Sequence, residues 1–260
     1  MVDLDAEVLS AYLDEMMGLI HSAAAEPTRR IVDLGSGTGT GAVALLRRFG
    51  GAEVTAVDAA ESMLARVRAK AVALGLDDAV RTVQADLDAS WPVAGPVDLV
   101  WASASMHHMA DPDRVLADIF GALRPGGLLA VAELDSFPRF LSGDLGDGLE
   151  ARCHAVLAEA RAQDMPHMGD DWGTRLSKAG FVVEQDRTFT IDLTPPLPAA
   201  TARYARAALG RARTGLAGRI SDADLATLDA LLDDDAPDSI LRRTDLRVRT
   251  TRTLVLARRP

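Results

Sequence analysis

A glycine-rich segment near the start of the sequence has the composition of a ligand-binding loop. Residues 33–41 read Asp-Leu-Gly-Ser-Gly-Thr-Gly-Thr-Gly, and they lie between an apolar run at 30–34 and a helical pattern at 42–49. Glycine tolerates positive φ and lets a backbone approach a ligand closely. The N-terminus of the following helix offers unpaired N–H groups and a partial positive charge. We therefore expect this segment to bind a nucleotide-like ligand.

Three carboxylates stand at the ends of successive predicted strands. Asp33, Asp58 and Asp86 close or follow the apolar runs 30–34, 54–58 and 80–85. The carboxyl ends of such strands line the crevice in which doubly wound sheets bind ligands. Asp33 suits a cationic amino-acid head group, Asp58 is placed to accept two ribose hydroxyls, and Asp86 can accept from an adenine amino group. A phosphate-free ligand made of adenosine and a cation fits this set, which describes S-adenosylmethionine.

A dinucleotide is the main alternative ligand. Residues 37–42, Gly-Thr-Gly-Thr-Gly-Ala, fit the dinucleotide-binding pattern, and Asp58 follows at about the right distance. An NAD(P)-dependent oxidoreductase therefore stays open. A catalytically silent protein that binds S-adenosylmethionine is the third hypothesis, because a fold does not by itself fix a function.

Short apolar runs alternate with helical patterns through the first half of the chain. Near-continuous apolar strands in such alternation are typical of a buried parallel sheet. Asp111 is expected to cap a helix that begins at Pro112, and Gly75 to end an earlier one. The expected fold is α/β, a doubly wound, mostly parallel, Rossmann-like sheet. Its strands are predicted at 30–34, 54–58, 80–85, 97–102, 128–134, 181–192 and 247–257.

Five motifs in order resemble those of the class I S-adenosylmethionine-dependent methyltransferases. They occupy residues 32–39, 57–64, 84–87, 98–109 and 123–128, and the likeness is to the ubiquinone/menaquinone-biosynthesis-type and natural-product small-molecule group. The resemblance implies a seven-stranded sheet, the cofactor S-adenosyl-L-methionine, and methyl transfer to O, N or C of a small-molecule acceptor by in-line displacement. It also implies cofactor contacts from Asp33, Gly35, Ser36, Gly37, Gly39, Asp58, Ala59, Met63, Asp86, Leu87, Ala102 and Ser103.

Few side chains are candidates for a role in the chemical step. Transfer from a sulfonium mainly requires alignment, and a base only where the acceptor must lose a proton. His107 and His108 follow the fourth predicted strand, and histidine titrates near neutral pH. His107 is the candidate base, although such a pair can also merely shape the loop. Candidate substrate contacts are His107, His108, Trp172 and Tyr12, with core packing as the other role for Trp172.

Helical insertions complete the expected organisation. One methyltransferase domain is predicted over residues 1–260, with cap elements at about 1–25, 136–172 and 199–235. Residues 203–219 hold five arginines, and residues 222–238 hold seven aspartates. These blocks are interpreted as two helix faces that attract each other, or alternatively as an anion-binding patch of Arg203, Arg206, Arg211 and Arg213.

Composition excludes several other classes of protein. A net charge of −10 disfavours nucleic acid as a partner, and Cys153 as the sole cysteine rules out an intrachain disulfide or a cysteine metal cluster. No run approaches the roughly 18 apolar residues of a membrane-spanning helix. An acidic N-terminus is unlike a signal peptide, so a cytoplasmic protein is expected. The preference for arginine over lysine and the high alanine content are typical of a GC-rich bacterial genome, and no bound metal is expected.

Overall fold

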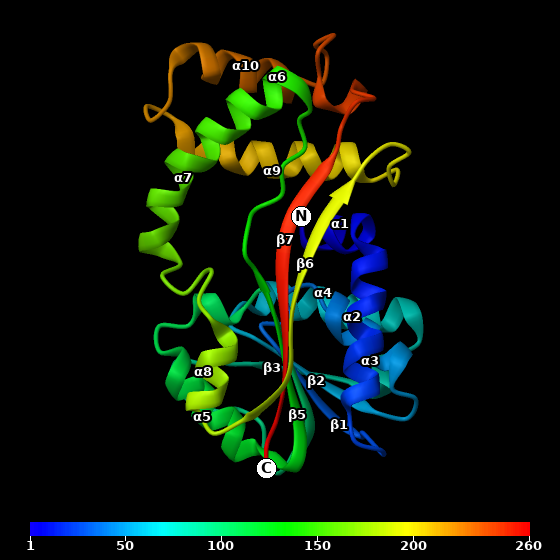
Figure 1. Ribbon diagram of the computed structural model, residues 1–260. Coiled ribbons are helices and arrows are strands. Elements are labelled where there is room, and N and C mark those ends of the chain that lie inside the picture. The colour runs from blue at the N-terminus through cyan, green and yellow to red at the C-terminus, as the bar shows by residue number, and fades with distance from the viewer. The chain divides into compact units, whose positions relative to one another are not determined.

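The computed structural model describes residues 1–260, apart from the side chains of residues 144, 146, 147, 160, 163 and 164. Its strands are β1 (Arg30–Leu34), β2 (Glu53–Asp58), β3 (Val80–Gln84), β4 (Val97–Ser103), β5 (Leu123–Leu134), β6 (Val182–Leu193) and β7 (Val248–Arg258). The longer helices are α1 (Val2–Val8), α2 (Ser10–Ala23), α3 (Thr40–Arg48), α4 (Glu61–Leu74), α5 (Pro112–Ala122), α7 (Ala151–Asp164), α8 (Trp172–Lys178), α9 (Thr201–Leu216) and α10 (Asp222–Leu232). Short turns of helix are η1 (Asp77–Ala79), η2 (Met106–His108), α6 (Gly143–Leu145), η3 (Gly146–Glu150) and η4 (Ile240–Arg242) (Figure 1).

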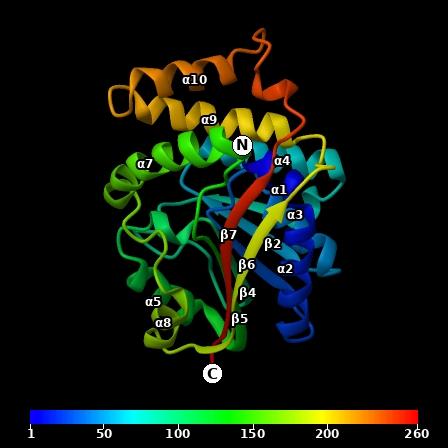
Figure 2. The ribbon, with the colours of Figure 1, turned by 45° about the horizontal axis from the view of Figure 1, so that its top comes forward.

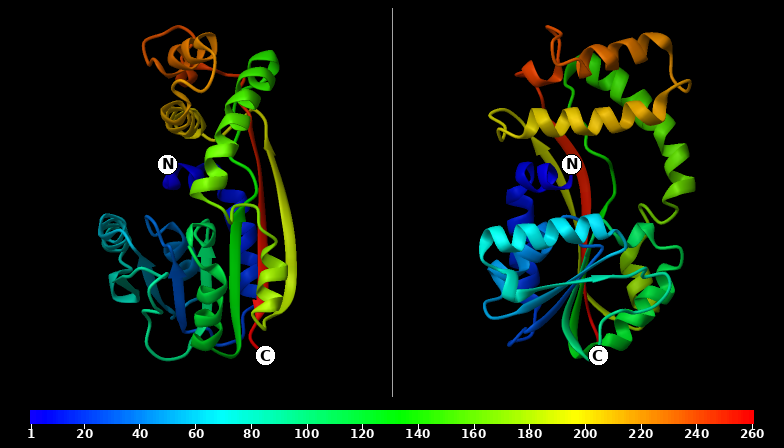
Figure 3. Two further views of the ribbon diagram at one scale, coloured as in Figure 1. Left: turned by 90° about the vertical axis from the view of Figure 1, so that its left-hand side faces the viewer. Right: turned by 180° about the vertical axis from the view of Figure 1, so that it is seen from behind.

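The strands form one seven-stranded sheet in the order β3-β2-β1-β4-β5-β7-β6. Strands β1 to β5 pair in parallel, and β7 runs antiparallel to β5. Figure 3 shows β7 and β6 side by side at one edge. The predicted fold class, a doubly wound and mostly parallel sheet, is thus confirmed.

The start of β5 differs most from the prediction. We expected this strand to begin at residue 128, but β5 already begins at Leu123. The pairing partner of Val97 is Leu123, and that of Leu99 is Leu128, so the register shifts between them. The glycine-containing stretch therefore bulges out of the ladder instead of ending it.

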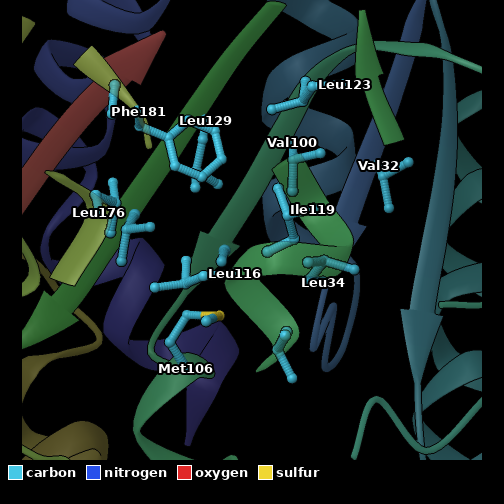
Figure 4. Packing of buried hydrophobic residues seen from close by; sticks show 14 of the residues in the cluster. Val32, Leu34, Val100, Met106, Leu116, Ile119, Leu123, Leu129, Leu176 and Phe181 are labelled. Atoms are coloured by element: carbon cyan, nitrogen blue, oxygen red, sulfur yellow. The ribbon is translucent and has the colours of Figure 1, made fainter. Parts of the chain in front are cut away.

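Helices cover both faces of the sheet. Figure 1 shows α5 and α8 on one side of the strands and α2 and α3 on the other. Alternate residues of a strand point to opposite faces, so Val32 and Val100 pack towards α5, where Leu116 and Ile119 meet them (Figure 4). The N-terminus of α5 is fixed as predicted, because the Asp111 carboxylate accepts a hydrogen bond from the Arg114 N–H.

Trp172 belongs to this core. It is 3% exposed at the start of α8 and lies in the same buried cluster as Leu176 and Phe181. Burial of its ring favours a packing role, and its contact with a substrate stays a prediction. The alternative role, anchoring α8 against the sheet, is the one that the packing shows.

The chain divides into two compact units. Unit 1 comprises residues 1–10, 135–166 and 190–251, and unit 2 comprises residues 11–134, 167–189 and 252–260. Unit 2 contains the glycine-rich segment and all of the hydrophobic cluster described above. Unit 1 contains α1, α7, α9 and α10.

The charge blocks at 203–219 and 222–238 attract each other within unit 1. Figure 2 shows α9 and α10 side by side. The guanidinium of Arg206 reaches the Asp234 carboxylate at 2.5 and 3.0 Å, and that of Arg213 reaches Asp229 at 2.7 and 3.0 Å. Arg203 also pairs with the Glu7 carboxylate at 3.7 Å, so three of the four arginines of the predicted anion-binding patch are paired with carboxylates of this chain.

The described residues were also compared with the requirements of a membrane-spanning helix and of a metal site. Within its described residues there is no helix long and apolar enough to cross a membrane. Among the same residues, no group of three or more His, Cys, Asp or Glu side chains could hold a metal ion.

Candidate functional site

Three glycines shape the loop that follows β1. Gly35, Gly37 and Gly39 have φ values of 64°, 51° and 79°, and Gly39 is the N-cap of α3. Gly35 also lies against the loop after β4, since a Cβ built on it would come within 2.4 Å of the Ser105 Cβ. Glycine is therefore required at position 35 both for its φ and for this close approach.

Asp33 lies near the end of β1, two positions before Gly35. It is buried, and its carboxylate can accept further hydrogen bonds. Its side chain is 2% exposed, and the backbone N–H of Ala42 donates to it. Its Oδ2 atom has no hydrogen-bond partner among the described residues. Burial, together with the charge of Asp58, raises the pKa of Asp33 to about 7, although the Ala42 N–H acts in the opposite direction. Such a carboxyl favours a cationic partner.

Gly41 lies close to the unused oxygen of Asp33. A Cβ built on Gly41 would lie 3.1 Å from Asp33 Oδ2 and 2.6 Å from Trp101 Nε1. Trp101 Nε1 is likewise buried without a partner in the described part of the chain, and so is the Ser36 hydroxyl. Buried polar atoms in native proteins are nearly always paired, so these three point to a polar ligand or water beside the loop.

Asp58 holds the loop from the end of β2. Its Oδ2 accepts the Gly37 N–H at 2.9 Å, and its Oδ1 accepts the Ala60 N–H at 2.9 Å. Each carboxylate oxygen has two acceptor positions. Asp58 can therefore order the glycine-rich loop and still accept hydroxyl hydrogens from a ligand.

The remaining predicted cofactor contacts divide by burial. Asp86 and Ala59 are exposed at the same edge of the sheet, while Met63 and Ser103 are half-buried. Leu87 and Ala102, in contrast, are members of the hydrophobic cluster. Their predicted contact with a cofactor stays a prediction, and packing of these side chains favours contact through the backbone.

A buried carboxylate organises the loop after β4. Glu133, 3% exposed near the end of β5, accepts the backbone N–H groups of Ser105 at 3.2 Å and Met106 at 2.8 Å through Oε1. Its Oε2 lies 2.5 Å from His107 Nδ1, and His107 is itself 2% exposed. Glu133 and His107 thus form a buried carboxylate–imidazole pair.

Comparison with known proteins assigns this part of the chain. Residues 31–127 match the family model described as a methyltransferase domain. This segment is a methyltransferase domain. The resemblance of these residues to the class I methyltransferases is thereby confirmed, since the match includes the first four motifs and the fifth as far as residue 127.

Related proteins extend the likeness beyond the methyltransferase domain. The chain is 35% identical over 157 residues to malonyl-[acyl-carrier protein] O-methyltransferase of Laribacter hongkongensis, covering 58% of this chain and 50% of that protein. It is 40% identical over 111 residues to demethylmenaquinone methyltransferase of Thermus thermophilus, covering 43% and 50%. The chain thus spans about half the length of these curated relatives.

A solved structure shares the fold along nearly the whole chain. A crystal structure of a candidate methyltransferase from Bacillus halodurans C-125 has a TM-score of 0.61 at 19% identity. The alignment covers 96% of this chain and 99% of that one. At this identity the likeness concerns the fold alone, which includes the parts outside the methyltransferase domain.

The prediction from the sequence did not include two carboxylates that position loops of the methyltransferase domain. One is Glu133, and the other is Asp88, whose carboxylate accepts the backbone N–H groups of Ala110 at 3.0 Å and Asp111 at 3.2 Å. Both carboxylates reach N–H groups more than 20 positions away in the chain. The only signal in the sequence was that each acid lies near the carboxyl end of a predicted strand.

His108 and Tyr12 are placed differently from His107. The exposed His108 ring lies 4.2 Å from the His107 ring, and partial burial and His107 both lower the pKa of His108. The Tyr12 ring packs edge-on against Phe189 at 5.0 Å, with the Arg252 guanidinium 5.7 Å from its centre. Tyr12 therefore fastens α2 to the edge of the sheet.

A hollow in the surface of the domain lies at the wrong edge for a cofactor. It measures about 610 Å³ and is lined by residues that include Trp91, Pro96, Arg124 and Arg259. These residues flank the amino ends of β4 and β5. Ligands of such sheets bind beyond the carboxyl ends of the strands, so this hollow does not count as the site.

Removing the Glu133 carboxylate is expected to destabilise the protein. Glu133→Ala leaves the N–H groups of Ser105 and Met106 and the His107 imidazole without their acceptor, a loss of about 2–4 kcal/mol in the free energy of unfolding. Glu133→Gln keeps one acceptor oxygen and should lose less than half of that. Urea unfolding of the three proteins measures the difference. Equal stability of Glu133→Ala and the unaltered protein would contradict the assigned network.

Proposed function

We propose that this chain is an S-adenosylmethionine-dependent methyltransferase that transfers a methyl group to O, N or C of a small-molecule acceptor. The observation that carries the proposal is the buried Asp33 oxygen that has no hydrogen-bond partner among the described residues. A cationic, phosphate-free ligand suits this oxygen, whereas the pyrophosphate of NAD would be repelled by it. The methyltransferase domain at residues 31–127 supports the same interpretation.

The residues at the carboxyl edge of the sheet fit such a cofactor. Asp33 would pair with its ammonium group, Asp58 would accept its ribose hydroxyls, and Asp86 its adenine amino group. Further contacts are proposed from the loop residues Gly35, Ser36, Gly37 and Gly39, from Ala59, Met63 and Ser103, and from the backbone of Leu87 and Ala102. The bound sulfonium supplies an activated methyl group, so the protein mainly aligns the two reactants and excludes water.

His107 is the proposed base for acceptors that must lose a proton. Glu133 Oε2 at 2.5 Å from Nδ1 accepts the proton on that nitrogen. A carboxylate partner at Nδ1 leaves Nε2 as the atom that can take a proton. We propose that Nε2 does so, and that Glu133 is a positioning residue that holds the ring and its tautomer.

Acceptor recognition is proposed for the helical segments outside the methyltransferase domain, at about 1–25, 136–172 and 199–235. Most of these residues belong to unit 1, although residues 11–25 and 167–172 belong to unit 2. We further propose that the enzyme works in a bacterial cytoplasm on a small molecule, with neither a metal ion nor nucleic acid as a partner. The net charge of −10 supports the last point.

Calorimetric titration separates the proposal from its alternatives. S-adenosylhomocysteine should bind with micromolar or tighter affinity, and NADH should give no heat. Binding of NADH without a response to S-adenosylhomocysteine would establish the oxidoreductase instead. If S-adenosylhomocysteine binds but mass spectrometry detects no methylated product across a broad acceptor panel, the catalytically silent binding protein is the better interpretation.

Asp58→Ala is expected to weaken binding of S-adenosylhomocysteine by about 1–3 kcal/mol, which is roughly 5- to 150-fold in affinity. The variant loses the proposed ribose acceptor and also the bond that holds the Gly37 N–H at 2.9 Å. Asp78→Ala, at an exposed position in η1, is the matched control and should bind as the unaltered protein does. Unchanged affinity in a folded Asp58→Ala variant would show that the pocket is misassigned.

A further inference from the structure

Unit 1 contains a cluster of basic side chains that have no role in the proposed methyl transfer. Arg139 lies in the segment that leads from β5 to α6, while His154 and Arg161 lie on α7. All three side chains are half-buried. His154 and Arg161 are seven residues apart, which is two turns of helix, so they share one face of α7.

The geometry of Arg161 prepares its guanidinium for a planar anion. Its Cζ atom lies 3.6 Å from the centre of the Phe137 ring. Stacking on an aromatic ring fixes the guanidinium plane and leaves the N–H donors in that plane directed outward. An arginine held in this way loses less conformational entropy when it binds a carboxylate with two hydrogen bonds.

Backbone contacts place Arg139 beside α7. Glu150, 1% exposed just before α7, accepts the backbone N–H groups of Phe140 at 2.7 Å and Leu141 at 3.0 Å. Arg139 itself exchanges backbone hydrogen bonds of 2.9 and 3.0 Å with Arg249. The segment that carries Arg139 is thus tied on one side to the start of α7 and on the other to β7.

Among the described side chains, this cluster holds more positive than negative charge. Burial, followed by the charges of Arg139 and Arg161, lowers the pKa of His154 to about 4. Neither arginine forms an ion pair with a side chain that the structure describes, in contrast to Arg206 and Arg213 on α9. Glu150 is the described carboxylate that faces Arg139 electrostatically, and its charge is shared with Arg249, whose guanidinium lies 3.9 Å from Glu150 Oε2.

We propose that Arg139 and Arg161 form a binding site in unit 1 for the carboxylate group of a small organic acid. Phe137 would hold the Arg161 guanidinium in plane, and Arg139 would supply the second cation. The inference rests on the proposed function in one respect, namely that the bound acid is the methyl acceptor. The binding itself does not depend on that function.

Titration with tricarballylate, a simple tricarboxylic acid, tests the site on the full chain. Arg139→Gln and Arg161→Gln should each weaken tricarballylate binding by at least about tenfold, the loss of one charged two-point contact. Arg206→Gln, whose arginine is paired with Asp234, is the matched control and should change binding less than about twofold. Arg161→Lys keeps the charge without the planar fork and should fall between the two. Equal binding by all of these folded proteins would overturn the proposal.

The titration midpoint of His154, measured by proton NMR, distinguishes ligand binding from a structural role of Arg139 and Arg161. If the two arginines were only structural, the ligand would leave this midpoint unchanged. A bound carboxylate offsets the charges of Arg139 and Arg161, so saturating tricarballylate should raise the titration midpoint of His154 above its value of about 4 by about one pH unit or more. An unmoved midpoint would contradict the site. A parallel titration uses inorganic phosphate. If phosphate changes the midpoint of His154 more than tricarballylate does, the assignment of the site to a carboxylate is overturned.

S-adenosylhomocysteine separates this inference from the proposed function. All of the arginine variants should bind it as the unaltered protein does. If S-adenosylhomocysteine binds and tricarballylate does not, only the carboxylate site fails. If tricarballylate binds and S-adenosylhomocysteine does not, the proposed methyltransferase activity fails while the carboxylate site stands.

Discussion

Asp33→Asn is expected to stabilise the ligand-free protein above pH 7 and, at the same time, to abolish cofactor binding. Burial is the main reason that the pKa of Asp33 is raised from 3.8 to about 7, so the folded protein binds this proton more tightly than the unfolded chain does. The stability that the protonated carboxyl contributes is fully present below about pH 4 and is lost as the pH rises through 7. Because a tenfold change in proton affinity corresponds to about 1.4 kcal/mol, the ionised carboxylate costs about 2–4 kcal/mol at pH 8. Asparagine has nearly the same shape and cannot ionise.

Urea unfolding at pH 5 and pH 8 measures this effect. The difference in free energy of unfolding between the two pH values should be smaller in Asp33→Asn than in the unaltered protein by about 2 kcal/mol or more. Asp78→Asn changes an exposed carboxyl and serves as the control. An identical pH dependence in all three proteins would show that Asp33 is not protonated in the ligand-free state.

The affinity for the cofactor should depend on the same proton. An ammonium group pairs with the ionised form of Asp33, so affinity for S-adenosylhomocysteine should rise by up to about tenfold per pH unit below pH 7 and level off above it. Asp33→Asn should show neither this rise nor strong binding at any pH. Calorimetric titration between pH 5.5 and 8.5 follows both, and a flat profile in the unaltered protein would contradict the proposed pairing with an ammonium group.

Gly35→Ala is expected to be the most damaging small substitution in the glycine-rich loop. The new Cβ would lie 2.4 Å from the Ser105 Cβ, and the φ of +64° adds backbone strain. Strain of this kind costs about 1–2 kcal/mol, and overpacking a rigid contact adds about 1–3 kcal/mol. The loop can relieve the contact only by moving away from Ser105, so binding of S-adenosylhomocysteine should fall together with stability.

Two further variants separate the clash from the strain. Gly75→Ala introduces the same strain at φ +65° with no atom within 4 Å of the new Cβ, and should cost only about 1 kcal/mol. Gly35→Ala combined with Ser105→Gly removes the clash and should recover the additional loss. Equal unfolding free energies for Gly35→Ala and Gly75→Ala would mean that the close approach to Ser105 is not a constraint.

The local features of the fold were readable from the sequence because each depends on residues close together in the chain. Alternating apolar runs and helical patterns predicted the parallel strands, and Asp111 followed by Pro112 predicted the start of α5. The glycine-rich loop and the acids at successive strand ends were visible for the same reason. The bulge at residues 124–127 was not, since it depends on how β5 registers against β4.

Only the tertiary structure decided the contacts between residues that are distant in the sequence. Glu133 reaches Ser105 and His107 across 28 and 26 positions, and Gly35 meets Ser105 across 70, because β4 lies between β1 and β5 in the sheet. The sequence by itself determined the methyltransferase domain and the acids at its strand ends. It could not determine which of those acids is buried deeply enough to hold its proton to about pH 7, because burial depends on the packing of every neighbouring strand and helix.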